Sequence, residues 1–179
     1  MTGGPGGGAG SGGPGGGGLG GGRSAGGGTF EAATGDGPAV AAAEVEQRSR
    51  DVRSALDGLL QIRRLTLHQG GGDPKAVPAE WERRQPVRAV ALALESGGLT
   101  PSSVDASGTR ITTGYRVRAG DRPGTTVVEW LGPPGSGAAQ EETAALGACV
   151  PALARLGWEA LLYKGPRGRR FLEVEPLTS

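Results

Sequence analysis

The densest group of chemically capable side chains is a basic turn near the C-terminus. Its cations are Lys164, Arg167, Arg169 and Arg170, which stand within seven residues of one another. Glycine and proline separate them, as is typical of a hairpin turn. Arginine at such a tip can hold phosphate groups, because its planar guanidinium presents several donors at once. These four residues are therefore a candidate anion- or nucleic-acid-binding site, although a solvated turn facing nearby glutamates is the interpretation we favour.

A second basic group is expected along a predicted strand, where Arg116 and Arg118 alternate with apolar residues. They could extend a nucleic-acid-binding surface, but an exposed strand arginine commonly pairs with a carboxylate across the sheet, here Glu129. The chain carries 19 basic and 18 acidic residues, a net charge of +1. This balance creates no strong positive field to attract nucleic acid. Nucleic acid is therefore an alternative partner and not the favoured one.

The candidate nucleophile, cysteine, and the candidate base, histidine, each occur only once in the sequence. Cys149 is the only cysteine, and His68 is the only histidine. Cys149 lies on the apolar stripe of a predicted helix, where a buried cysteine behaves as a small hydrophobic residue. One cysteine and one histidine supply neither a disulfide framework nor a zinc cluster. We therefore expect no catalytic residue, no metal site and no enzyme activity.

Two pairs of carboxylates are close enough in sequence to consider for acid–base chemistry or metal binding. Glu141 and Glu142 open a predicted helix, where the positive end of the helix dipole explains them. Glu173 and Glu175 lie on one face of a predicted strand, and arginines on neighbouring strands are their expected partners. The glycine-rich matches to dinucleotide-binding motifs follow no strand and open no helix. No cofactor is therefore expected.

The N-terminus is expected to be a disordered glycine-rich arm. Of the first 28 residues 18 are glycine, and Leu19 is the only large apolar residue after Met1. Such a segment cannot offset the roughly 1–2 kcal/mol per residue that backbone ordering costs. The composition stays small and mixed up to residue 43, so the arm is placed at 1–43. Neither a signal peptide nor a membrane-spanning run is predicted, which favours a cytoplasmic protein.

An amphipathic helical segment is predicted over 44–69. Val45, Val52 and Leu59 recur every seven residues, with Leu56 near the same stripe and charged residues on the opposite face. A run of glycines followed by Asp-Pro ends the segment and makes 70–76 a linker. This linker allows the helix to dock on its own domain or on a partner, and the sequence leaves both arrangements open.

Residues 77–177 are predicted to form one small α+β domain. Pro86 opens a helix that closes at Gly97, and a second helix spans 140–156. Each helix is followed by two alternating strands that a turn connects. The predicted strands are 109–118, 125–131, 158–164 and 169–175. This helix–hairpin–helix–hairpin order favours a four-stranded antiparallel sheet with both helices on one face.

Both faces of this sheet carry apolar residues, because three of the strands contain adjacent apolar pairs. The pairs are Val127–Val128, Leu161–Leu162 and Phe171–Leu172. One member of each pair must lie on the face that the helices leave open. An apolar patch of this extent is rarely exposed on a monomer. We therefore expect segment 44–67 or another chain to cover it.

These observations predict a non-enzymatic module for protein interaction or self-association, tethered by a flexible arm. The expected partner is another protein or a second copy of the chain. Neither a membrane nor a cofactor is expected as a partner. The predicted interface consists of Val52, Leu56, Leu59, Leu161 and Phe171. An accessory protein that binds nucleic acid through the arginine-rich turns is the alternative, and an enzyme is the least favoured class.

Overall fold

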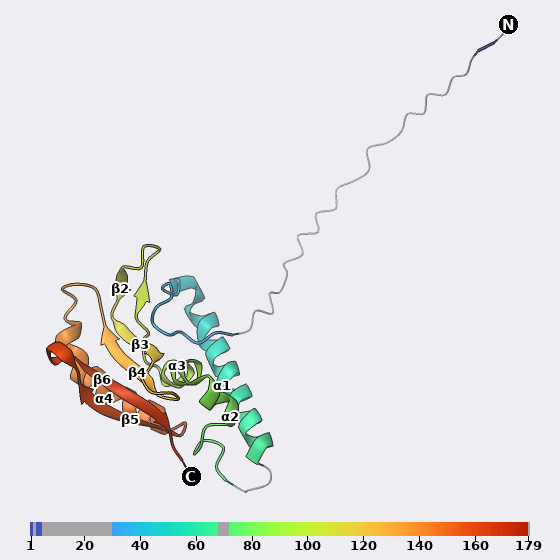
Figure 1. The fold of residues 1–179 in the computed structure, drawn as a ribbon. Coiled ribbons are helices and arrows are strands. Elements are labelled where there is room, and N and C mark those ends of the chain that lie inside the picture. The colour runs from blue at the N-terminus through green and yellow to red at the C-terminus, as the bar shows by residue number, and fades with distance from the viewer. Residues whose placement is uncertain (2, 5–29, 68–71, 179) are drawn as a thin grey trace.

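The computed structural model describes residue 1, residues 3–4, residues 30–67 and residues 72–178 (Figure 1). Most of the predicted disordered arm, together with His68, lies outside the described residues. The described chain combines helices with antiparallel strands, so the predicted α+β class is confirmed. None of the helices in these ranges is long and apolar enough to cross a membrane.

Four antiparallel strands form the main sheet (Figure 1). In spatial order they are β3 (Gly114–Ala119), β4 (Thr126–Leu131), β6 (Arg170–Pro176) and β5 (Trp158–Lys164). The register places Val117 opposite Val128, and Val128 opposite Leu172. Residues opposite one another point to the same face of a sheet. These three buried side chains therefore mark the face on which the core is built.

Two helices, α3 (Pro86–Ser96) and α4 (Ala138–Ala154), cover that face. α4 packs on β4, β5 and β6, while α3 packs on β3 and β4 and also against α4. Leu94 and Leu146 are fully buried in the core that results. A short helix, α2 (Glu80–Arg84), leads directly into α3.

The predicted amphipathic segment is a single helix, α1 (Val45–Leu67), which packs against α3 (Figure 1). Val52 and Leu59 are buried there, and Leu56 packs against the same core. The segment therefore docks on its own domain and does not cover the second face of the sheet. The reason is that residues 89–94 of α3 are all buried, so α3 needs apolar cover on the side away from the sheet as well.

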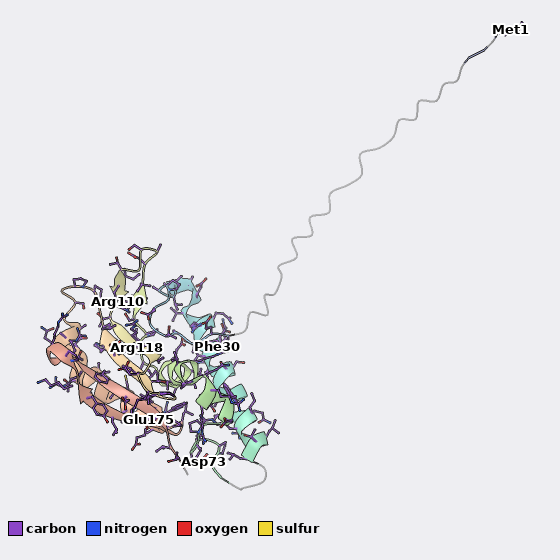
Figure 2. The ribbon with its side chains drawn as sticks, in the orientation of Figure 1. Met1, Phe30, Asp73, Arg110, Arg118 and Glu175 are labelled. Carbon is purple, nitrogen blue, oxygen red and sulfur yellow. The ribbon has the colours of Figure 1, made fainter. Side chains whose placement is uncertain are left out.

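Residues 30–37, here called the strap, lie against the domain, so the predicted disordered arm extends too far at residue 43. Ala32 is buried in the core and Phe30 packs against it, at the side of the molecule that carries α1 (Figure 2). The glycine-rich composition of the N-terminus does not predict these two apolar contacts. Burial of Phe30 and Ala32 supplies the free energy that orders the strap.

The strap also bonds to the backbone of β3. The N–H of Val117 donates to the carbonyl oxygen of Thr34 at 2.7 Å. Gly35, at φ +91°, passes so close to β3 that a Cβ there would lie 2.2 Å from the carbonyl oxygen of Tyr115. Only glycine allows this approach, because it has no side chain and tolerates positive φ.

The strand predicted over 109–118 is two strands in the structure. β2 (Arg110–Thr112) pairs with β1 (Ser103–Val104) in a separate two-stranded sheet, and β3 begins at Gly114. A Cβ at Gly114 would lie 2.3 Å from the carbonyl oxygen of Thr100. The break therefore falls where another segment crosses close to the backbone, a position that favours glycine.

Candidate interaction surface on the second hairpin

Ion pairs cover part of the second face of the main sheet, which is the face opposite α3 and α4. Arg116 and Arg118 each approach Glu129 at 3.4 Å, and Arg116 also binds Asp36 on the strap at 2.8 Å. Arg110 binds the other oxygen of Asp36 at 2.8 Å. Burial opposes ionisation of Asp36, but the hydrogen bonds from Arg110 and Arg116 outweigh it and lower the pKa of this carboxyl. The arginines predicted as an anion site on β3 are thus engaged by carboxylates.

Arg122, in the turn between β3 and β4, covers the same face farther along. Its guanidinium donates to Glu173 and to Glu175, the latter at 2.6 Å. Val127 lies on this face opposite Arg118 and Glu173, yet it is only 4% exposed. Long charged side chains can cover apolar surface with their stems while their ends stay in water. The prediction that a helix or a second chain must cover Val127 is therefore wrong.

The basic turn contains one arginine with a structural role. Arg169 donates to Glu142 on α4 at 2.7 Å and to the carbonyl oxygen of Trp130 at 3.0 Å. Glu142 is almost fully buried, and its other oxygen accepts the backbone N–H of Arg170. These bonds fasten the turn to α4. Among the described residues, no ion pair involves the side chains of the other three predicted cations, Lys164, Arg167 and Arg170.

The large apolar residues of β5 and β6 that are exposed or half-buried, here called the apolar patch, are Leu161, Tyr163 and Phe171 on the second face of the sheet and Leu162 on the helix-covered face. Leu161, Leu162 and Tyr163 are consecutive on β5, and they are 51%, 47% and 44% exposed. Phe171 lies opposite Tyr163 on β6, and the two rings stack with centroids 5.9 Å apart. Leu161 and Phe171 were predicted as interface residues, whereas Leu162 and Tyr163 were not. The sequence signal for Leu162 and Tyr163 is the uninterrupted Leu-Leu-Tyr run. A strand with one solvent-exposed face usually has polar residues at alternate positions of such a run.

The two edge strands of the main sheet differ, because other segments cover the outer side of β3 and leave the outer side of β5 open. At the β3 edge, Tyr115 donates its N–H to Thr100 at 3.0 Å and accepts the N–H of Ser102 at 2.8 Å, beside the strap. At the β5 edge, no backbone hydrogen bond joins the outer side of Trp158–Lys164 to any other described segment. An exposed edge presents a row of unpaired donors and acceptors to other chains. The apolar patch thus lies beside an open row of backbone hydrogen-bonding groups.

The hydrogen bonds at the two ends of the hairpin determine which backbone groups of β5 face outward. Leu177 donates to the carbonyl oxygen of Gly157 at 2.8 Å, and Gly165 donates to that of Arg169 at 2.7 Å. In a regular antiparallel pair, residues that bond across the pair alternate with residues that do not. Odd-numbered residues of β5 therefore bond to β6, and even-numbered residues face the edge. The outward N–H and C=O groups belong to Trp158, Ala160, Leu162 and Lys164.

Cys149 has the environment of a core residue. It is fully buried on α4, and its thiol donates to the carbonyl oxygen of Ala145 at 3.3 Å. Burial raises the pKa of the thiol to about 11. The thiolate, which is the nucleophilic form, is thus disfavoured at neutral pH. Within the described residues, no group of three histidine, cysteine, aspartate or glutamate side chains is placed to hold a metal ion.

A groove of about 800 Å³ lies between residues 31–40, the first turns of α1 and the loop 98–103. Its main charged groups are Arg48 and Glu95, which bind each other at 2.6 Å. Glu95 also accepts the backbone N–H of Ala33 at 3.0 Å. These charges hold the strap on the domain, so the groove is a consequence of how the strap docks.

No protein-family model, curated protein or solved structure matches this chain. The second hairpin, which consists of β5, β6 and the turn between them, combines the apolar patch, the open β5 edge and the three cations of the turn.

Proposed function

We propose that this protein is a non-enzymatic interaction module that binds an extended polypeptide segment along the β5 edge. The observation that carries the proposal is the apolar patch, whose residues Leu161, Leu162 and Tyr163 are exposed on the uncovered strand. A seven-residue strand without proline, with apolar side chains on both faces, is an efficient template for another strand.

Strand addition would use both kinds of group that β5 exposes. The outward N–H and C=O groups would supply a ladder of backbone hydrogen bonds, which gives affinity without sequence preference. The side chains of Leu161 and Tyr163 on one face and of Leu162 on the other would contact alternate residues of the partner and give specificity. A partner with apolar residues at these positions would bury the patch.

A peptide experiment tests the proposal with the full-length chain. The probe is a fluorescent peptide with the sequence of residues 158–164, N-methylated at the residues matching Glu159, Leu161 and Tyr163. Because N-methylation blocks one edge, the peptide presents a single hydrogen-bonding edge and cannot stack into fibrils. We expect saturable binding by fluorescence anisotropy when the full-length chain is titrated into a fixed, low concentration of the peptide.

Two lysine variants provide the comparison. Leu161→Lys introduces an ammonium group into the apolar patch and should weaken peptide binding by about tenfold or more. Leu65→Lys makes the same change at another exposed leucine, on α1, and should leave binding unchanged. No binding to a wild-type chain that is monomeric, or equal loss in both variants, would contradict the proposal.

A further inference from the structure

We infer that the partner of the β5 edge is a second copy of this chain, joined by antiparallel β5–β5 pairing about a two-fold axis. The inference rests on the proposed function and names the occupant of the edge. The product is a dimer in which the two four-stranded sheets become one continuous antiparallel sheet. Two-fold dimers are the commonest closed assemblies, and an edge-to-edge pair leaves no further β5 edge exposed.

The register follows from the geometry of the strand. A two-fold axis perpendicular to the sheet pairs one residue with its own copy, and opposite residues share a face. Leu161 is the midpoint of Trp158–Lys164, so only an axis at Leu161 overlaps the whole strand. The outward groups of Ala160 then meet those of Leu162 in the second copy, and those of Trp158 meet those of Lys164. Every outward backbone group of β5 gains a partner.

The side chains fit this register on both faces. Leu161 meets its own copy in a non-hydrogen-bonded pair, in which side chains approach most closely. On the helix-covered face, the large exposed Leu162 lies opposite the small Ala160 of the second copy. Tyr163 lies opposite Glu159, so its ring extends the contact beside the Leu161 pair. The exposed residues of β5 are thus covered by one symmetric contact.

The charges of the hairpin favour a second copy in this orientation. The turn end carries the three cations without an ion pair in the described chain, Lys164, Arg167 and Arg170. The other end carries Glu175 (Figure 2), which lies directly opposite Glu159. Of these two like-charged residues, Glu175 is bonded to Arg122 and Glu159 is not. Antiparallel pairing brings the acidic end of each hairpin level with the turn that carries Arg167 in the other copy, whereas Lys164 and Arg170 lie on the helix-covered face, away from Glu159 and Glu175. A parallel arrangement would place like charges together, which is unfavourable.

Cysteine cross-linking tests both the dimer and its register. In the proposed pair the two copies of residue 161 have Cα atoms about 4.5 Å apart, within the range for a disulfide. The two copies of residue 163 are offset by about 14 Å along the strands, which is too far. We therefore expect Leu161→Cys to form a covalent dimer on oxidation and Tyr163→Cys to stay monomeric on a non-reducing gel. The native Cys149 is buried and does not compete.

Sedimentation of the full-length chain provides the second measurement. The wild type and Leu65→Lys should sediment as dimers, and Leu161→Lys as a monomer, because it places two ammonium groups opposite one another. Glu159→Arg should weaken the dimer, and Arg167→Glu in the same chain should restore it. A monomeric wild type at all concentrations would overturn the inference. If that monomer still bound the N-methylated peptide, the proposed strand-binding function would stand without the dimer, whereas failure of both measurements would remove both.

Discussion

Arg63 and Glu82 form an ion pair with two hydrogen bonds of 2.6 Å, and each side chain is only 1% exposed. Arg63 also donates to the carbonyl oxygens of Pro74 and Leu156, each at 3.0 Å. The pair therefore joins the last turns of α1 to α2 and to the end of α4. A buried guanidinium is stable only when all of its donors are satisfied in this way.

Arg63→Ala is expected to lower the free energy of unfolding by about 3–5 kcal/mol, because it leaves the carboxylate of Glu82 buried without its charge partner. Urea denaturation of the full-length chain measures the change. The control is Arg84→Ala, which breaks the exposed ion pair with Glu80 and should change stability by less than about 0.5 kcal/mol. A loss below about 1 kcal/mol for Arg63→Ala would show that α1 is not fastened at this point.

Two N-terminal deletions should behave differently. Removal of residues 1–28 takes away only the glycine-rich segment and should change stability by less than about 0.5 kcal/mol. Removal of residues 1–40 also takes away Phe30, Ala32 and the bonds of Asp36, and should cost about 2 kcal/mol or more. Thermal unfolding of the two proteins side by side is the measurement. Equal stability would mean that the strap does not contribute to the fold.

The burial of Cys149 predicts a loss of stability in alkali. Its pKa rises from an ordinary 9.0 to about 11, so between these values the unfolded chain releases a proton that the folded chain keeps. The free energy of unfolding should therefore fall as pH rises from 9 to 11, by up to about 2–3 kcal/mol.

The Cys149→Ala variant is the control for this pH dependence. It should be less stable at neutral pH but should lose less stability between pH 9 and 10. Burial also raises the pKa of Tyr115, so a decline above pH 10 remains in both proteins. Identical slopes below pH 10 would contradict the assignment to the thiol. Urea denaturation at each pH gives the comparison.

The basic turn should respond differently to two arginine substitutions. Arg169→Ala removes the partner of buried Glu142 and should cost about 1–3 kcal/mol. Arg167→Gly removes an exposed cation whose φ of 60° favours glycine, so stability should be unchanged or slightly higher. Denaturation of both variants tests the assignment of these roles.

Nucleic-acid binding by the turn is measured with the same Arg167→Gly variant. At physiological salt we expect the wild-type chain to bind DNA and RNA no tighter than micromolar. The result that would favour the alternative function is a nanomolar, salt-dependent complex that Arg167→Gly weakens, with the slope in log salt reduced by about 0.9.

Local signals in the sequence predicted α3 and both hairpins. Pro86 at the first position of α3 and Gly97 after its last residue are short-range features, and the structure has a helix between them. The strap was missed because Phe30 and Ala32 contact residues far away in sequence, and their neighbours are mostly small. Composition averaged over the N-terminus cannot reveal two such contacts.

The second face of the sheet shows the same limit. Adjacent apolar pairs correctly indicated that apolar residues lie on both faces. They did not reveal that Arg118 and Glu173, on two different strands, cover Val127, because such pairing depends on the register of three strands. In the same way the sequence does not distinguish Arg169 from the other cations of its turn, because its partner Glu142 is 27 residues away.

The hydrogen bond between Thr34 and Val117 fixes the strap at one margin of the main sheet. The bond places Thr34 beside β3, the strand farthest from β5 in the sheet (Figure 1). From there the strap runs to Phe30, which contacts Arg88 on α3 and Arg48 on α1. In a pair joined through β5, the two straps would therefore lie at opposite margins of the joint sheet, about 30 Å apart. Charges at that spacing are screened from one another, because it exceeds the Debye length at physiological ionic strength several-fold. The dimer would hold the N-terminal segments of its two copies at a fixed spacing, so a target with two sites at that distance would be bound with a gain in effective concentration.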